Sequence, residues 1–318
     1  SVNVPEDSGR RGVKLYQQGD IKGAIEVLRS AVKERKDNSE AWHYLGLALN
    51  RNGDVKGARK AFETAVKLRP DFSPSHTGLA YALLLTNKLS EAGREAERAL
   101  ALDPKIAEAH YIVGAVRLRG KLYAKALEAS EAALRIKPEL SPALLVKTQA
   151  QVNIYLEAIA PVEKESRDSR VQRSREAGVH LREAVQSLEK FLALEPNVKN
   201  ADIWRQQLET MQVHSGSGGS DGPIFSPSEV TTKAVIRKKV EPQYTEYARQ
   251  SGIEGTVLMR AVFAADGKVK HILLVQALSH GLTEEAIKVA RQIKFNPAIK
   301  DGRPVSQFVQ IEYNFHLY

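Results

Sequence analysis

Histidine is the residue type in this sequence best suited to metal binding or acid–base catalysis, and the chain has eight histidines. His76 and His110 occupy one place in segments 34 residues apart, where Trp42 and Leu144 stand in neighbouring segments. Such a place needs bulk for packing, and equivalent places on stacked helix pairs lie ~10 Å apart, too far to share a metal ion. The remaining histidines lie in separate segments, without a Cys, Asp or Glu cluster at ligand spacing: His43, His180, His214, His271, His280 and His316. We therefore predict no metal site.

Other catalytic patterns are also missing from the sequence. We find no nucleophile elbow, no phosphate-binding loop and no paired catalytic carboxylates. The absence of cysteine excludes disulfides, thiol catalysis and thiolate metal sites. We predict a protein that is not an enzyme and uses no cofactor. An enzyme whose site is built from unrecognised residues is the third alternative, after the two given below.

Composition limits the partners. A net charge of +9 permits binding to nucleic acid, anionic lipid or acidic glycan, but no dense basic stripe with interleaved aromatic residues is present, so we predict no nucleic-acid partner. No apolar run approaches the ~20 residues of a membrane helix, so we predict no membrane span in the chain as given. The chain begins at Ser1 without Met, which indicates a processed or cut fragment whose leader or anchor stood upstream.

A 34-residue period organises the first half of the chain, in blocks that begin at residues 5, 39, 73, 107 and 141. Small residues recur at three places of the block: Gly12, Gly46, Ala80 and Gly114; Ala24, Ala58, Ala92 and Ala126; Ala31, Ala65, Ala99 and Ala133. Three blocks close with Pro70, Pro104 and Pro138. Closely packed helices need small residues where their backbones meet, and Pro ends the second helix because it cannot continue one. The period therefore predicts stacked helix pairs.

These blocks resemble the tetratricopeptide repeat, most closely from Trp42-His43-Tyr44-Leu45-Gly46 through Ala58, Phe62, Ala65 and Pro70. The resemblance implies an all-α superhelix over residues 5–212 that binds protein partners. The fifth block carries 24 extra residues between its two helices, judged from Ala184 and Pro196. This charged insertion, 163–182, is expected to lengthen one or both helices into solvent. Residues 201–212 are expected to form a helix that caps the array.

The first helix of each repeat builds the concave face of such an array. The repeat template places these residues there: His43, Leu47, Asn50, Thr77, Tyr81, Leu84, Tyr111, Ala115, Leu118, Leu145 and Gln149. Arg51 and Arg119 flank this apolar and aromatic groove, which suits a partner helix or an extended peptide with large side chains and some acidity. Filling of the groove by the chain's own linker or insertion is the alternative. Family members that bind chaperone tails hold a carboxylate with Lys, Asn and Arg, and the corresponding side chains here exclude that role: His43, Leu47, Gly78, Glu108 and Ile112.

A domain boundary falls in the Gly/Ser-rich stretch 215–223, and we predict a flexible linker over residues 213–229. Beyond it the hydrophobic period changes to two. Residues 255–264 alternate, Asp266-Gly267 signals a hairpin turn, and 269–277 follows as its second strand. The helical face formed by Leu282, Ala286, Val289, Ala290 and Ile293 and an alternating last segment complete the pattern. We predict a small α+β domain over 230–318, an antiparallel sheet packed on two helices.

The second domain has a resemblance of its own, carried by Pro242-Gln243-Tyr244, by 252–257, by Asp266-Gly267-Lys268-Val269, by 295–298 and by 301–305. In this order and spacing these segments resemble the C-terminal domain of TonB-type energy transducers. Thr245 departs from the family pattern, which continues with Pro. The chain also shows neither the membrane anchor nor the Pro-rich spacer of such transducers, and helical repeats stand in their place, so coupling to the proton-motive force does not follow.

In that family the last strand lies at a sheet edge and receives an extended segment of an outer-membrane receptor. Free backbone groups on an edge pair with a peptide, and alternate side chains provide selectivity. The corresponding edge here is Phe308, Val309, Gln310, Ile311, Glu312, Tyr313, Asn314, Phe315, His316 and Leu317. An edge that pairs with a second copy, or is merely covered, is the alternative.

Together these patterns predict a two-module interaction protein of the cell envelope, with one partner in the repeat groove and a receptor segment on the sheet edge. The resemblance alone implies the Gram-negative periplasm, with or without an upstream inner-membrane anchor. The alternative is a soluble periplasmic scaffold whose second domain serves self-association.

Overall fold

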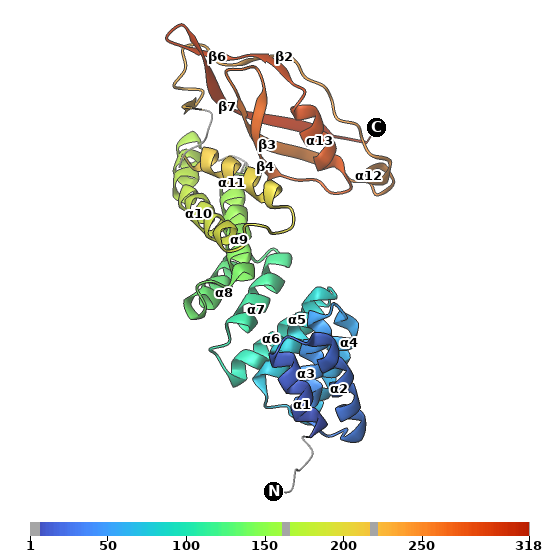
Figure 1. Cartoon of the computed structure of the whole chain (residues 1–318). Helices are drawn as coiled ribbons and strands as arrows, with labels where there is room; N and C mark the ends of the chain where they lie inside the picture. The colour runs from blue at the N-terminus through green and yellow to red at the C-terminus, as the bar shows by residue number, and fades with distance from the viewer. Residues whose placement is uncertain (1–6, 161–165, 217–221, 318) are drawn as a thin grey trace. The chain divides into compact units, whose positions relative to one another are not determined.

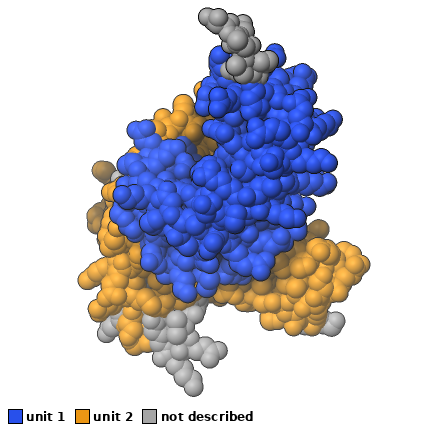
Figure 2. Space-filling view, turned by 90° about the horizontal axis from the view of Figure 1, so that it is seen from below, with its two compact units in different colours: residues 1–150 blue, residues 151–318 orange. Residues whose placement is uncertain are grey.

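A computed structural model describes residues 7–160, 166–216 and 222–317, and the chain forms two compact units, residues 1–150 and 151–318 (Figures 1 and 2). The first unit is entirely helical. Its helices are α1 (Ser8–Gln17), α2 (Ile21–Glu34), α3 (Ser39–Arg51), α4 (Val55–Leu68), α5 (Ser73–Leu85), α6 (Leu89–Leu102), α7 (Ala107–Arg119), α8 (Tyr123–Ile136) and the first part of α9 (Ser141–Ile159).

The small residues of the repeat lie where helices touch, as the period predicts. Ala24, Ala58, Ala92 and Ala126 have no exposed surface. The buried ring of Phe62 fills the space that two glycines leave, because a Cβ on Gly46 or Gly78 would stand 2.7 or 2.5 Å from a ring carbon. Such distances are shorter than carbon–carbon contact allows, so these positions accept only Gly while Phe62 keeps its place.

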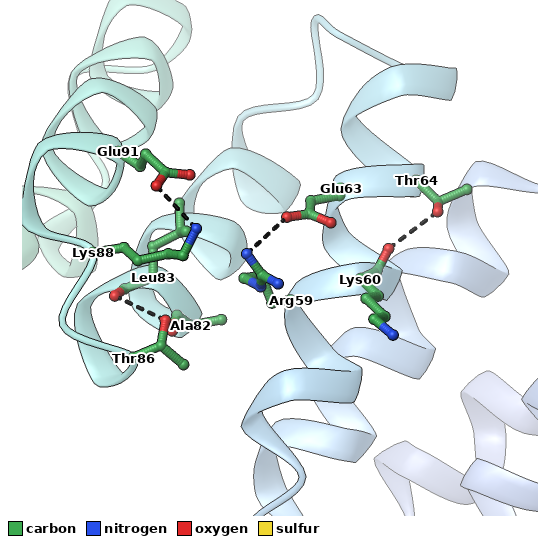
Figure 3. Close-up of polar contacts among 9 residues, drawn as sticks. All are labelled: Arg59, Lys60, Glu63, Thr64, Ala82, Leu83, Thr86, Lys88 and Glu91. Carbon is green, nitrogen blue, oxygen red and sulfur yellow. Dashed lines mark hydrogen bonds and ion pairs between the residues drawn. The ribbon is translucent and has the colours of Figure 1, made fainter.

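Side-chain caps fix where several of the helices begin. Asp20 Oδ1 accepts a hydrogen bond from Gly23 N at 2.9 Å, and Asp54 Oδ1 accepts one from Gly57 N at 2.8 Å. Each cap satisfies a backbone donor that the first helical turn leaves free. On the outer helices, short-range contacts add to this, among them Arg59–Glu63 at 3.5 Å and Lys88–Glu91 at 3.1 Å (Figure 3).

The repeat place shared by His76 and His110 has a hydrogen-bonding role that the sequence did not reveal. His76 Nε2 lies 3.0 Å from the Pro70 carbonyl oxygen, and His110 Nε2 lies 3.0 Å from that of Pro104. Trp42 Nε1 donates to the carbonyl oxygen of Lys36 at the same distance, also six residues upstream. The place therefore ties three first helices, α3, α5 and α7, to the preceding connection through a ring N–H, in addition to its bulk.

The second unit begins with the end of α9 and continues with α10 (Arg167–Leu194) and α11 (Ala201–Ser215). The insertion lengthens this helix pair, since α9 and α10 have 19 and 28 residues against 13 or 14 in the repeats from α3 to α8. Gln151 Nε2 donates to Glu183 Oε2 at 2.6 Å between the two helices. The helix α11 ends three residues beyond the sequence-based expectation.

A mixed sheet with strand order β1-β7-β3-β4 forms the rest of this unit. Its strands are β1 (Ile224–Phe225), β3 (Gly255–Phe263), β4 (Val269–Gln276) and β7 (Arg303–Phe315), and β6 (Ala298–Lys300) also pairs with β7. All pairs are antiparallel except β1 with β7. A separate ribbon joins β2 (Val235–Lys238) to β5 (Lys294–Asn296). The predicted hairpin is confirmed, whereas the parallel β1 and this ribbon were not predicted.

Both faces of the sheet are covered. The odd-numbered residues of β3 and β7, such as Met259 and Ile311, pack in one core with α12 (Glu246–Gln250) and α13 (Leu282–Ala290). On the opposite face Val262 and Phe308 pack against Val213 of α11. The alternation read from the sequence thus separates two cores, one under the domain's own helices and one under the last helix of the array (Figure 1).

Candidate functional site

A groove of about 580 Å³ opens in the first unit, lined mainly by the first helices α3, α5 and α7. Six of the predicted groove residues line it together: His43, Leu47, Asn50, Thr77, Tyr81 and Tyr111. Leu84 and Ala115 are buried in the helical core instead, and Leu118 packs against that core. Leu145 and Gln149 of α9 do not line this groove.

Nine other residues line the groove: five come from the first helices α5, α7 and α9, and four come from α4 and from the connections before α7 and α9. A template limited to first helices cannot place the last four. These additional residues are Phe62, Pro74, Gly78, Asp103, Ile106, Glu108, Ile112, Leu140 and Pro142. Among them Asp103 and Ile106 precede α7, and Leu140 precedes α9. The apolar residues of this set form part of the groove wall, and its two acids, Asp103 and Glu108, give the wall negative charge.

Two uncharged polar side chains lie in the groove wall. Burial lowers the pKa of His43 to about 4, and its Nδ1 lies 3.0 Å from Ser75 Oγ, so the ring is neutral near pH 7. The Oδ1 atom of Asn50 is buried and has no hydrogen-bond partner among the described residues. A buried acceptor of this kind costs about 1–3 kcal/mol until a donor reaches it.

The charge of the groove differs from the sequence-based expectation of flanking cations. Arg119 donates from Nη1 to the Leu84 carbonyl oxygen at 3.1 Å, at the end of α5, and Arg51 does not line the groove. The charged lining residues are Asp103 and Glu108. Asp103 Oδ1 accepts from the backbone of Lys105 at 2.9 Å, and Glu108 pairs with Lys137 at 3.0 Å. The groove is therefore acidic in a chain of net charge +9.

The predicted edge strand is β7, which ends at Phe315, so His316 and Leu317 lie beyond it. One edge of β7 pairs with β3 over the whole register from Gly255↔Phe315 to Phe263↔Gln307. The parallel β1 covers the other edge only at Ser306 and Gln307. Among the described residues no strand pairs with this second edge over 308–315.

Backbone geometry shows which residues of β7 face the open edge. Ala264 N donates to the Lys268 carbonyl oxygen across the β3–β4 turn, so even-numbered residues at this end of β3 face β4 and odd-numbered residues face β7. Through the pair Phe263↔Gln307, odd-numbered residues of β7 then face β3. The residues left facing outward are Phe308, Gln310, Glu312 and Asn314.

One side chain already occupies this edge. Lys239 Nζ donates to the carbonyl oxygen of Glu312 at 2.6 Å and lies 4.2 Å from the ring centre of Tyr313. This contact is consistent with the carbonyl group of Glu312 facing the open edge and not β3. Side chains alternate as expected, with Ile311, Tyr313 and Phe315 buried between exposed neighbours.

The helices that end the array hold the opposite face of the sheet. His214 Nε2 donates to the His271 carbonyl oxygen at 2.7 Å, and burial lowers the pKa of His214 to about 4. Arg260 of β3 donates to the Tyr155 hydroxyl at 2.8 Å and lies over the Phe308 ring. The predicted linker thus begins with the last three residues of α11, Val213, His214 and Ser215, and it also contains β1, which pairs with β7. Its residues 217–221 lie outside the described residues. Its flexibility stays a prediction.

The described residues hold no cluster of three or more His, Asp or Glu side chains suited to a metal ion. In the same part of the chain, no helix combines the length and hydropathy that a membrane crossing requires.

Comparison with known proteins identifies both modules. Residues 10–73 and 49–116 match two models of the tetratricopeptide repeat. MamA from Desulfovibrio magneticus RS-1 is 19% identical, covers 58% of this chain and 98% of its own, and superposes with a TM-score of 0.44. TTC0263, a tetratricopeptide protein of Thermus thermophilus, is also 19% identical and covers 65% of this chain and 97% of its own, with a TM-score of 0.42.

The C-terminal part matches a different family. Protein TonB of Vibrio cholerae is 34% identical over 102 residues, which are 32% of this chain and 42% of that protein. The chain thus spans less than half the length of this relative. Residues 240–317 match the model of the Gram-negative bacterial TonB protein C-terminal domain. The predicted fusion is confirmed: tetratricopeptide repeats, a class of protein-binding module, precede a TonB-type C-terminal domain.

Proposed function

We propose that this chain connects two protein partners in the envelope of a Gram-negative bacterium. An extended segment of an outer-membrane receptor adds as a strand to the open edge of β7, and the repeat groove docks a second partner. The periplasm is the proposed compartment, because the C-terminal domain is of the TonB type. The work is binding rather than catalysis.

The open edge of β7 is the observation that carries this proposal. The outward residues Phe308, Gln310, Glu312 and Asn314 offer a row of donors and acceptors to a peptide. An edge strand of this kind gives affinity through main-chain hydrogen bonds and selectivity through alternate side chains. Because β3 holds the other edge from Gln307 to Phe315, we expect β7 to remain in place when a segment is added.

Hydrogen exchange of the full chain tests the edge directly. The probes are synthetic decapeptides from the periplasmic N-terminal segments of outer-membrane receptors encoded in the same genome. Strand addition predicts that the amides of Gln310, Glu312 and Asn314 exchange more slowly when peptide is bound. The amides of Val309 and Ile311, already paired with β3, serve as internal controls and should change little. Peptide binding without slower exchange at the outward amides would contradict strand addition.

Self-association through the same edge is the second candidate, since a second copy of β7 offers the same unpaired groups. In that case the outward amides would be protected without any peptide, in proportion to protein concentration. Sedimentation velocity over a range of concentrations separates the two candidates, because only self-association produces a dimer in the absence of peptide.

A further inference from the structure

The repeat groove is lined by acids and by no Lys or Arg. Asp103 and Glu108 are the charged lining residues, although Lys and Arg outnumber Asp and Glu in the chain by 47 to 38. His43 is neutral near pH 7, and Arg119, whose charge acts on Tyr111, is not itself among the lining residues. The charged residues that line the groove are thus negative, although the net charge of the whole chain is positive.

The arrangement on α7 sets an acid beside an aromatic and an aliphatic side chain. Glu108, Tyr111 and Ile112 are spaced i, i+3 and i+4, so they share one face of the helix, and all three line the groove. Tyr81 of α5 lies on the opposing wall. A cation reaching Glu108 can also lie over a tyrosine ring, which adds to its attraction. Lys137, which pairs with Glu108 from outside the groove lining, would share that carboxylate.

The side-chain oxygen of Asn50 is a further polar atom of the groove wall, and it can accept a hydrogen bond from a peptide backbone. Asn50 Oδ1 is buried in the wall without a partner, so a donor that reaches it after a rotation of the side chain would replace no existing hydrogen bond of that atom. An extended segment brings an N–H at regular intervals, whereas a helix has used its own. This acceptor therefore favours an extended occupant.

We propose that the groove binds an extended peptide segment in which apolar side chains stand next to Lys or Arg. The apolar side chains occupy the space between Leu47, Tyr81 and Tyr111, the cation reaches Asp103 and Glu108, and a backbone N–H of the peptide donates to Asn50. This inference rests on the proposed groove, and it reverses the acidic partner expected from the sequence.

The test uses three decapeptides with a neutral fluorescent label and amidated ends, made of Ser, Gly and two Leu with two variable residues. The variable residues are Lys in the first peptide, Gln in the second and Glu in the third. Anisotropy titrations with the full chain should show the Lys peptide bound at least tenfold more tightly than the Glu peptide, and the preference should shrink with added salt. The chain's positive net charge acts in the opposite direction, so it cannot produce this result.

Substitutions then assign the preference to the groove. Asp103→Asn with Glu108→Gln should reduce the ratio between the Lys and Glu peptides to within about twofold. The matched control, Asp71→Asn with Glu131→Gln, removes two carboxylates that do not line the groove and should keep the ratio. Asn50→Leu should weaken all three peptides alike. Circular dichroism shows whether each variant is folded. If the variant Asp103→Asn with Glu108→Gln unfolds, Glu108→Gln alone is used in its place.

Each outcome decides the matter. Equal binding of the three peptides, or tighter binding of the Glu peptide, overturns the charge selection. If peptide binding is still lost in the variant Tyr81→Ala with Tyr111→Ala, the groove remains a peptide site, but one without selection by charge. Failure of all three peptides to bind, or binding that the tyrosine change leaves intact, overturns the inference together with the groove as a peptide site.

Discussion

The ammonium group of Lys239 lies 2.6 Å from the carbonyl oxygen of Glu312, at the one stretch of β7 that we propose as a receptor site. An incoming strand would offer a backbone N–H to the same oxygen, so the lysine and the peptide compete for it. The side chain of Lys239 is 31% exposed, which leaves it a path away from the edge.

Lys239→Met should therefore increase the affinity of the edge for receptor peptide by about threefold to tenfold, since a net hydrogen bond of this kind is worth ~1 kcal/mol. Lys238→Met is the matched control, because it removes the same charge from the exposed strand β2. Titration of labelled peptide into both variants gives the result. Equal effects in the two would show that charge, and not competition at Glu312, governs binding.

Proline variants test the direction of the backbone groups. Gln310→Pro removes an N–H that faces the open edge and should abolish peptide binding while the domain stays folded. Ile311→Pro removes an N–H that faces β3 and should destabilise the sheet by ~3 kcal/mol or more. Circular dichroism and peptide titration together separate the two effects. A Gln310→Pro variant that folds and binds normally would rule out strand addition at this edge.

The tyrosines of the groove can be distinguished from packing residues. Tyr81→Ala with Tyr111→Ala should weaken partner binding while the repeats stay folded, because both residues line the groove and are only partly buried. Ala92→Leu, at a helix contact with no exposed surface, should instead destabilise the array by about 1–3 kcal/mol. Thermal unfolding beside binding titrations measures both. Equal destabilisation by the two changes would mean that the tyrosines are packing residues.

Acid should destabilise the second unit through His214. Burial lowers its pKa from 6.5 to about 4, so the unfolded chain binds more protons between these values. The stabilisation present above pH 6.5 is therefore lost as the pH falls towards 4, up to ~3 kcal/mol. Its partner, the His271 carbonyl oxygen, accepts from neutral and charged imidazole alike.

The two tryptophans allow this to be followed unit by unit. Trp204 lies on α11 in the second unit and Trp42 on α3 in the first, so Trp42→Phe leaves a single reporter, on the helix that also carries His214. Urea unfolding of this variant at pH 7 and pH 4.5 should show the loss, and His214→Gln, which keeps an N–H donor, should reduce it. The exposed His316, changed to Gln, is the control. An unchanged pH dependence in His214→Gln would assign the acid effect to other groups.

Periodic features of the fold could be predicted because they depend on spacing alone. The 34-residue small-residue pattern predicts the helix pairs, and alternation along 255–264 and 308–315 predicts both β3 and the buried side of β7. What could not be predicted depends on tertiary position. The acid Asp103 enters the groove from the connection before α7, and β1 pairs with a strand about 80 residues later in the chain. Such contacts leave no local period.

Contacts between one repeat and the connection before it were equally hidden. The ring N–H bonds of Trp42, His76 and His110 follow a fixed six-residue offset to a carbonyl, but Leu144 at the fourth equivalent place masks the polar role. Bulk is readable from the Trp, His and Leu side chains at the four places, whereas a shared donor is not, because Leu has none.

The unbroken register of β7 with β3 also has a mechanical meaning. Nine residue pairs join the two strands without a bulge, and they run along the strand that would hold the receptor segment. A pull along the axis of β7 loads these pairs in shear, so they share the tension and must fail together. A pull across the sheet would open them one after another. The domain is thus built to resist tension in the direction in which an added strand would transmit it.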